Sequence, residues 1–398
     1  MRRTLVQRVL GPQATLAHWG WLSVVAALGL TALGLYAIDV ASSLTPPESL
    51  GAVASRTRVQ AIFAGVGILA ALVVALPDQR VWRLLAWPAL AGVIGLLVFV
   101  LIPWVPTWLV RPRNGCRGWI DLGPVDVQPS ELAKIAYTLA AAEYLRHSRN
   151  HRTLVGLIPP AVITMIPIGL VLLQPDLGMA MLFVPALFAM LLCAGARLKH
   201  LTAVVLAAAL AGPMVYPLLK PHQKQRIVGL IKQVRGEAAQ ASDPELFQAV
   251  TAVRVAGAGQ TGGYSDAKAR AVVHYSRLPE RHNDMIFSVV VARFGLPGGL
   301  AVFALYGVWL AGALLTAAST RDAFGRLVAV SFAAIVATQA TINIGMNLGV
   351  MPIIGLTLPF VSYGGSSLLT VWVMTGLLVG IALRRPPRMA RESLAFND

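Results

Sequence analysis

The sequence predicts an all-α polytopic membrane protein of about ten transmembrane helices, and three observations support this fold class. The chain of 398 residues is 57% hydrophobic, with a mean hydropathy of +0.69. Only 13% of its residues are charged, against about 25% in a typical soluble protein. Apolar runs of membrane-helix length recur along the whole chain, and the alternating segments typical of an outer-membrane barrel are missing.

Ten apolar segments predict the helices in chain order. The first, from Trp19 to Leu44, is too long for the core of a signal peptide, so we expect it to be retained as an anchor. The ten segments lie near 19–44, 59–76, 84–102, 131–146, 154–173, 176–194, 201–218, 285–316, 326–349 and 367–383. We expect one membrane domain over 1–398, with short tails at 1–18 and 384–398.

The distribution of basic residues predicts the orientation. With the N-terminus inside, the cytoplasmic segments hold sixteen Lys and Arg, and the short outer loops hold five. This excess obeys the positive-inside rule and places both termini in the cytoplasm. The net charge of +16 is therefore largely topological, and nucleic acid is not an expected partner. The sixteen are Arg2, Arg3, Arg8, Arg80, Arg83, Arg146, Arg149, Arg152, Arg197, Lys199, Arg321, Arg326, Arg384, Arg385, Arg388 and Arg391.

The two cysteines indicate neither a disulfide nor a zinc site. Cys116 falls in an outer loop and Cys193 near the inner end of a helix, so the membrane separates them. The chain has no Cys/His spacing typical of zinc and no Walker, Rossmann or HExxH pattern.

A long polar segment, about 220–284, is expected on the outer face. It holds ten Lys and Arg and six Asp and Glu, a net +4 that the positive-inside rule does not explain. This charge favours an anionic partner such as a phosphate-bearing headgroup or polymer, although a merely solvated loop is the alternative. Apolar spacing from Pro244 to Ala256 predicts a helix lying on the membrane. The glycines that follow allow tight turns, at Gly257, Gly259, Gly262 and Gly263.

The stretch 278–287, LPERHNDMIF, carries the strongest candidate for chemistry. Asp284 stands where the polar segment ends and an apolar run begins, beside Arg281 and His282. Charged groups at a bilayer edge are costly to desolvate, so such a cluster faces water, a headgroup or a polar cavity. The alternative role for Asp284 is to cap the helix that follows, and one residue can do both.

A second cluster runs from Asn114 to Lys134. Ser130 is expected to cap the fourth helix, which places Glu131 and Lys134 three residues apart on one helix face. The two charges either form a structural ion pair or line a polar cavity. Trp119 is either an interfacial anchor or an apolar surface for a sugar ring.

Two further motifs lie at expected outer helix ends. Asp176 in QPDLG is expected to be a turn or cap residue rather than a catalyst. The glycine pair before Ser366 and Ser367 suits either a phosphate at the helix N-terminus or close helix packing. Asn343 and Asn347, four residues apart, are placed to line the same cavity.

Together, four motifs in order resemble those of the SEDS family (shape, elongation, division and sporulation), the polytopic peptidoglycan glycosyltransferases. They are NG-x-x-x-WIDLGP-x-x-x-QPSELAK, QPDLG, LPERH-x-D-x-IF and NIGM…PFVSYGGSS. The resemblance spans roughly 110–385, and the LPERH and NIGM forms are more similar to the RodA elongation branch than to the FtsW division branch.

The resemblance implies ten transmembrane helices in a bacterial inner membrane, with the active site on the outer face. It implies polymerisation of lipid II: the acceptor 4-hydroxyl attacks the donor anomeric carbon, and undecaprenyl pyrophosphate leaves with inversion. Asp284 is then the catalytic residue. The expected substrate-binding residues are Trp119, Glu131, Lys134, Arg281, His282, Ser366 and Ser367.

The same resemblance implies a class B penicillin-binding protein as partner. The leaving pyrophosphate needs positive charge, from basic side chains or from a divalent cation such as Mg²⁺ or Mn²⁺, and no organic cofactor is expected. The residues that would bind a metal are not identified by the sequence.

One departure from the family pattern concerns the residues before Phe294-Gly295. Members usually carry an acidic pair there, whereas this chain has Ala292-Arg293. Arg293 could point into the cavity of Asp284 or into a neighbouring helix. This departure keeps open a non-catalytic scaffold for cell-wall synthases. A lipid II flippase is a further alternative, because it would use the same substrate and suit the same basic loop and cavity.

Overall fold

The structure, a computed structural model, describes residues 18–46, 53–112, 116–123, 125–148, 150–215 and 244–384. Apart from His18 and Arg384, the two predicted tails lie outside the described residues. The first part of the predicted outer loop, 220–243, also lies outside them. Three residues of the first motif do so as well, namely Asn114, Gly115 and Pro124.

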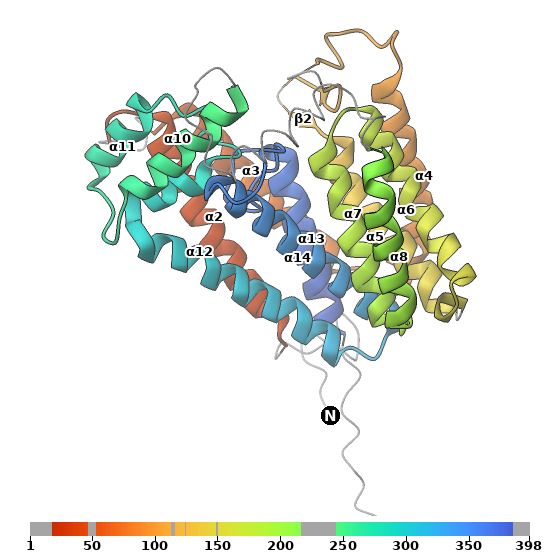
Figure 1. Ribbon diagram of the computed structural model, residues 1–398. Helices are drawn as coiled ribbons and strands as arrows, with labels where there is room; N and C mark the ends of the chain where they lie inside the picture. Colours follow the sequence, from red (N-terminus) through yellow and green to blue (C-terminus); the bar gives the residue numbers. More distant parts are fainter. Residues whose placement is uncertain are drawn as a thin grey trace, which may run out of the picture.

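The described residues are almost entirely helical (Figure 1). The first half comprises α2 (Gly20–Ser42), α3 (Ser55–Ala75), α4 (Gln79–Leu101), β1 (Ile120–Asp121), β2 (Asp126–Val127), α5 (Pro129–His147), η2 (Asn150–Arg152), η3 (Val155–Leu157), α6 (Ile158–Leu173) and α7 (Leu177–Cys193). The second half comprises α8 (Leu198–Val215), α10 (Pro244–Ala258), α11 (Asp266–Tyr275), α12 (Ile286–Ser319), α13 (Ala323–Asn347) and α14 (Gly365–Leu383).

The all-α membrane fold predicted from composition is confirmed. Within the described residues, seven helical segments are long and apolar enough to cross a membrane. They are α2, α3, α4, η3 with α6, α12, α13 and α14. A helix also occupies each of the three other predicted ranges: α5, which carries charges, and the shorter apolar α7 and α8. The number of ten spans therefore stays a prediction.

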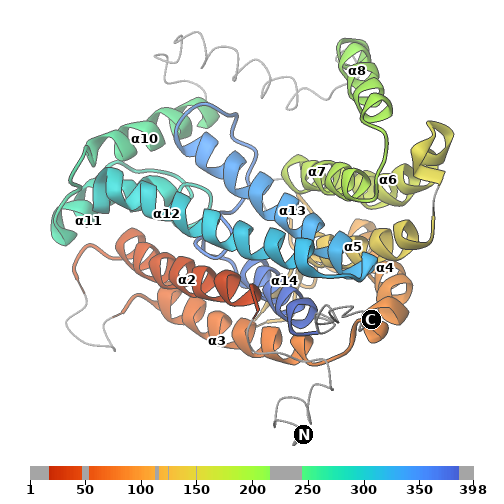
Figure 2. The same cartoon turned by 90° about the horizontal axis from the view of Figure 1, so that it is seen from below.

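Helix α13 lies between two groups of helices (Figure 2). On one side α2, α3, α12 and α14 pack together, and on the other α4, α5, α6 and α7 do. Helix α8 lies at the edge of the molecule in Figure 2. Because α13 is mostly buried, its polar side chains meet other protein groups rather than lipid.

Helix α12 was predicted as one uninterrupted span and is in fact broken near its start. Gly295 has φ +66°, a left-handed conformation that favours glycine. The backbone of Gly263 crosses so closely that a Cβ added at Gly295 would lie 2.5 Å from its nitrogen. Pro297 follows two residues later and has no N–H for the helix. The interruption therefore results from a backbone crossing that hydrophobic periodicity does not reveal.

The described part of the predicted outer loop is ordered into two helices. The helix predicted over 244–256 is confirmed as α10, and α11 was not predicted. Both pack against α12, at the end of the bundle shown at the upper left of Figure 1. Hydrogen bonds from Tyr264 N to Ala292 O (3.1 Å) and from Leu296 N to Gln260 O (3.1 Å) join this segment to the break in α12.

Candidate active site

Asp284 lies in the turn before α12 and does not cap that helix. The residue at the N-cap position is Met285, and no side chain makes a capping hydrogen bond there. The cap interpretation is therefore wrong, because the helix begins one residue too late for the Asp284 carboxylate to reach its first N–H groups. Within the described part of the chain, this half-buried carboxylate accepts no hydrogen bond.

Two asparagines of α13 hold the backbone of Asp284. The amide nitrogens of Asn343 and Asn347 donate to its carbonyl oxygen at 2.9 Å and 2.8 Å. Asn347 also accepts from the backbone N–H and the hydroxyl of Ser288, at 3.0 Å and 2.8 Å. The pair thus fixes the position of Asp284 while leaving its carboxylate free. That the two asparagines line a cavity stays a prediction; in the structure both are fully buried and act through the backbone of Asp284.

The surroundings of Asp284 make its carboxyl group less acidic than usual. Burial raises the pKa of Asp284 to about 7, and the negative charges of Glu280 and Asp176 add to this effect. A Cβ added at Gly355 would lie 3.7 Å from one carboxylate oxygen, so the glycine leaves that side open. Among the described residues, no cation therefore compensates this half-buried carboxylate.

Three basic side chains gather beside this turn. Burial lowers the pKa of both Arg281 and His282, and the nearby positive charge of Arg56 lowers them further. Arg281 donates to the carbonyl of Val273 at the end of α11, at 3.4 Å. The ring of His282 packs edge-on against Tyr363 with centroids 5.9 Å apart. The mutual repulsion of these groups would be relieved by an anion.

The predicted ion pair between Glu131 and Lys134 is confirmed. Lys134 Nζ lies 2.8 Å from a Glu131 carboxylate oxygen, and both side chains are fully buried. The same ammonium donates to the side chain of Gln339 on α13, at 3.2 Å. The predicted cap at Ser130 is wrong, because α5 begins at Pro129, whose ring suits the first helical position, and Ser130 lies inside the helix.

A chain of polar contacts leads from this ion pair to α14. Gln339 donates to the hydroxyl of Thr357 at 3.2 Å, and Thr357 shares a hydrogen bond of 3.1 Å with Ser367. Ser366 donates to the carbonyl of Asp126 at 2.7 Å. Both serine hydroxyls are thus engaged inside the protein.

Close packing, one of the two roles considered for the glycine pair, is found at Gly365. A Cβ there would lie 2.7 Å from the ring of Phe63 on α3. The alternative, a phosphate at the start of α14, stays a prediction.

The first motif lies beside the turn that contains Asp176. A Cβ added at Gly118, next to the half-buried Trp119, would lie 3.4 Å from the side-chain oxygen of Gln174. Asp176 accepts from Met179 N at 3.0 Å and is the N-cap of α7, as predicted. Gln128, just before α5, donates to its other oxygen at 3.3 Å. The structure therefore brings the first, second and third motifs to one end of the bundle.

Sequence reasoning missed two glutamines that hold this end together. Gln339 joins Lys134 to Thr357, and Gln60 of α3 donates to Ser362 O at 3.0 Å and accepts from Gly364 N at 3.1 Å. Gln60 lies in the second turn of α3, and Gln339 lies well inside α13, each in a helix long and apolar enough to cross a membrane. Because such residues are costly in a bilayer, their position alone was the signal that could have found them.

The described side chains do not form a metal site of their own. Among them, no three His, Cys, Asp or Glu groups come together around one point. Mg²⁺ is commonly held by one or two carboxylates together with substrate phosphates, so a cation here would depend on the substrate. The predicted Mg²⁺ or Mn²⁺ stays a prediction, and no step below requires it.

Arg293 points away from Asp284 and into neighbouring elements. Its Nε donates to the hydroxyl of Tyr36 at 2.8 Å, and one terminal nitrogen donates to Tyr264 O at 2.9 Å. The guanidinium also lies 3.7 Å from the carboxylate of Asp266 on α11. Of the two orientations considered from sequence, the structure therefore has the one toward neighbouring helices.

These contacts belong to a set of five side chains, the Arg270 network, that ties α2 to α11 and α12. Arg270 is 1% exposed and pairs with Asp39 at 2.6 Å and with Asp266 at 2.9 Å. The Tyr36 hydroxyl donates to Asp266 at 2.6 Å, and Arg293 completes the set. Every charge in the Arg270 network has an opposite partner.

The bundle and the motifs gathered at one end of it define a polytopic membrane protein with a positioned carboxylate that has no cationic partner among the described residues. The chain belongs to the FtsW/RodA/SpoVE family of cell cycle proteins, whose sequence profile matches residues 21–386. This membership confirms the family suggested by the four motifs and makes the chain an integral membrane protein.

Three relatives illustrate the match. A probable peptidoglycan glycosyltransferase FtsW from Nitrosococcus halophilus is 33% identical over 93% of this chain and 94% of its own. RodA, the rod shape determining protein of Thermus thermophilus, is 28% identical in its crystal structure, with a TM-score of 0.66 over 93% of this chain and 98% of its own. A chain from a peptidoglycan synthase complex that coordinates polymerisation and crosslinking is 31% identical, with a TM-score of 0.77 over 92% and 98% of the two chains.

Proposed function

We propose that this chain is a peptidoglycan glycosyltransferase that polymerises lipid II, with Asp284 as its general base. One observation supports the role of Asp284: its half-buried carboxylate is positioned through its backbone and has no cationic partner in the part of the chain that the structure describes. A general base works best when its pKa lies near the operating pH, and a pKa of about 7 meets that condition.

The proposed reaction is a single displacement. Asp284 accepts the proton of the acceptor 4-hydroxyl while the oxygen forms a bond to the donor anomeric carbon. The bond between that carbon and the pyrophosphate oxygen breaks, and its electron pair leaves with undecaprenyl pyrophosphate. The anomeric configuration inverts, and the proton held by Asp284 is later released to water.

The basic side chains beside Asp284 suit the leaving group. Arg56 on α3 comes close to Arg281 and His282 beside Asp284, and developing negative charge on pyrophosphate would be stabilised by these three groups. Lys134 is neutralised by Glu131, so we propose that this pair shapes the site through Gln339 rather than contacting pyrophosphate. Trp119 remains a candidate for contact with a sugar ring.

The proposed setting is the bacterial cytoplasmic membrane, with both termini inside and Asp284 on the outer face. The distribution of basic residues supports this orientation. We propose a class B penicillin-binding protein as partner, because the similar synthase complex couples polymerisation to crosslinking.

The test is polymerisation by the purified chain. Labelled lipid II and a divalent cation would be supplied with and without the penicillin-binding partner, and glycan products separated on a gel, with Asp284→Ala alongside. Polymer from the wild type and none from the folded variant would support the enzyme and its base. Equal polymer from both would remove Asp284 from the mechanism.

The scaffold and flippase functions are less well supported than the polymerase, for different reasons. The scaffold interpretation was motivated by Arg293 in place of an acidic residue, and this arginine belongs to the Arg270 network instead of the Asp284 turn. The polymerase requires a carboxylate beside the acceptor hydroxyl, whereas a flippase requires one only if its transport is coupled to protons. A chain that moves lipid II across vesicles yet forms no polymer would favour the flippase.

A further inference from the structure

A cationic cavity opens at the end of the bundle opposite to Asp284. It has a volume of about 340 Å³ and lies between the C-terminal ends of α5 and α7 and the N-terminal end of α13. Pockets that bind small molecules have volumes on the order of 300–1,000 Å³. Its polar lining consists of Arg146, Ser148, Arg152, Cys193 and Arg326.

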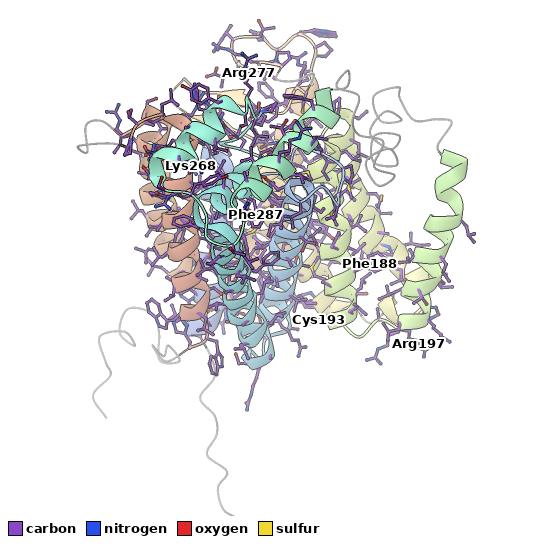
Figure 3. All side chains as sticks on the ribbon, turned by 60° about the vertical axis from the view of Figure 1, so that its left-hand side comes forward. Phe188, Cys193, Arg197, Lys268, Arg277 and Phe287 are labelled. Carbon is purple, nitrogen blue, oxygen red and sulfur yellow. The ribbon has the colours of Figure 1, made fainter. Side chains whose placement is uncertain are left out.

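The cavity is separate from the candidate active site. Asp176 begins α7 beside Asp284, whereas Cys193 ends it at the cavity, and 17 helical residues span about 25 Å. Figure 3 shows the same separation, with Cys193 and Arg197 at the lower end and Arg277 and Lys268 on the upper part. A ligand in this cavity would therefore not touch the reacting groups.

One of the three arginines has a structural explanation. Arg146 lies in the last turn of α5, where a cation is favoured by the helix dipole, and its Nε lies 2.7 Å from a carboxylate oxygen of Glu143. Removal of Arg146 would therefore disturb the end of α5. It is the least informative of the three.

The other two arginines lack that explanation. Among the described residues, neither Arg152 nor Arg326 is paired with a carboxylate. Arg326 is in the first turn of α13, where the helix dipole disfavours a cation. The nearest acid in sequence, Asp322, pairs instead with Arg83 and caps α13 through Gly325 N at 2.9 Å. Two guanidinium groups with no carboxylate partner among the described residues thus line one cavity, and Arg326 also contacts the thiol of Cys193.

We propose that this cavity binds the phosphate group of an anionic membrane lipid. Guanidinium groups suit phosphate because they donate paired hydrogen bonds in a fixed plane. A membrane lipid is favoured over a soluble phosphate because exposed apolar side chains adjoin the cavity residues in the chain. Leu154 and Val155 lie two and three residues after Arg152, and Leu192 directly precedes Cys193; these three side chains are 50%, 75% and 47% exposed.

The expected position of the cavity relative to the membrane agrees with a lipid ligand. The excess of basic residues places this end of the bundle at the cytoplasmic leaflet, and basic pockets between helices on that side are typical sites for anionic headgroups. The lipid would contact α5, α7 and α13. Of these three helices, α13 is the one whose other end donates a hydrogen bond to Asp284.

The experiment measures lipid retention by the purified full-length chain. Wild type and Arg152→Gln/Arg326→Gln would be titrated in detergent with phosphatidylglycerol or phosphatidylcholine, and bound lipid counted by native mass spectrometry. The matched control is Arg197→Gln/Arg321→Gln, which removes two exposed charges that do not line the cavity. Melting temperatures are measured for all proteins to check that they are folded. If the double variant melts below the wild type, Arg326→Gln alone is used in its place.

We expect saturable retention of phosphatidylglycerol but not of phosphatidylcholine. The cavity variant should bind about tenfold more weakly than the control, a difference of about 1.4 kcal/mol. Ala323→Leu, which fills the cavity and keeps its charges, should weaken binding as well.

Three results would overturn the proposal. Equal loss in the cavity variant and the control would indicate general surface charge. Full displacement of the lipid by inorganic phosphate at millimolar concentration would assign the site to a soluble anion. Unchanged retention in both the cavity variant and Ala323→Leu would place the lipid elsewhere.

Discussion

The turn before α12 that contains Asp284 (280–285, the Asp284 turn) and the Arg270 network lie at the same end of α12 but differ in how their carboxylates are paired. In the Arg270 network each carboxylate has a guanidinium partner within 2.6–3.7 Å. At the Asp284 turn the carboxylate has none, and its closest charged influences are two further acids. The Arg270 network joins the helices α2, α11 and α12. The turn before α12 instead leaves the Asp284 carboxylate able to accept a proton.

The difference shows how a charged residue can be assigned a role. Paired charges that bridge helices serve the fold, and removing one partner leaves the other buried and uncompensated. An unpaired carboxylate whose position is fixed through its backbone weakens the fold and is retained for another reason. Arg293 illustrates the point, because its location in the Arg270 network explains a departure that first suggested loss of activity.

The largest expected effect is on chemistry at Asp284. Asp284→Asn keeps the shape of the side chain and removes the base, so the polymerisation rate should fall about 100- to 10,000-fold. The measurement is the initial rate of glycan formation from labelled lipid II. Glu280→Gln is the matched control, since it removes a neighbouring acid that is not the proposed base, and it should stay active.

The next effect is on stability in the Arg270 network. Arg270→Met leaves Asp39 and Asp266 without their main partner, and the cost should be about 3–5 kcal/mol. Thermal unfolding of the purified chain in detergent measures it. A melting temperature equal to that of the wild type would show that the Arg270 network contributes nothing to stability.

The pH dependence of the rate should follow the raised pKa of Asp284. The base acts when ionised, so the rate should rise with pH and level off above about 7, the pKa that burial gives this group. A profile that levels off near pH 4, the usual range of an aspartate, would contradict the proposed environment.

The raised pKa of Asp284 also makes the stability of the fold depend on pH, and stability should fall with rising pH while the polymerisation rate rises. An unfolded aspartate has a pKa of about 3.9, so between this value and 7 the folded chain holds a proton that the unfolded chain has lost. Wild-type stability should fall as pH rises through that window. Asp284→Asn, which stays neutral, should melt above the wild type at pH 8, with the difference narrowing toward pH 4.

The smallest expected effect is at Arg293, which is partly exposed. Arg293→Gln should cost about 1–2 kcal/mol through its contacts with Tyr36 and Tyr264, with the polymerisation rate unchanged. Rates and melting curves on one preparation would measure both. A rate as low as that of Asp284→Asn in a well-folded variant would move Arg293 into the active site.

The sequence predicted what depends on local pattern. Long apolar runs place the helices to within a few residues, and the spacing of Glu131 and Lys134 predicts their ion pair. The motif resemblance identified Asp284, the residue that the structure leaves unpaired.

The rest depends on contacts between distant segments. The break at Gly295 results from a crossing with Gly263, and the orientation of Arg293 depends on Tyr36 and Asp266, which belong to other helices. The cap predicted at Ser130, and the cap considered as an alternative role for Asp284, are both wrong because each helix starts one or two residues away from the position that a cap there requires. Helix boundaries depend on such small shifts, which residue preferences alone do not resolve.

The most direct test of the account measures activity and stability together for Asp284→Asn at pH 8. Polymerisation of lipid II and the melting temperature would be determined on the same preparation as the wild type. The account predicts loss of polymer with a melting temperature equal to or above that of the wild type. A variant that loses activity only in proportion to a lower melting temperature would show that Asp284 supports the fold, and would contradict its role as the base.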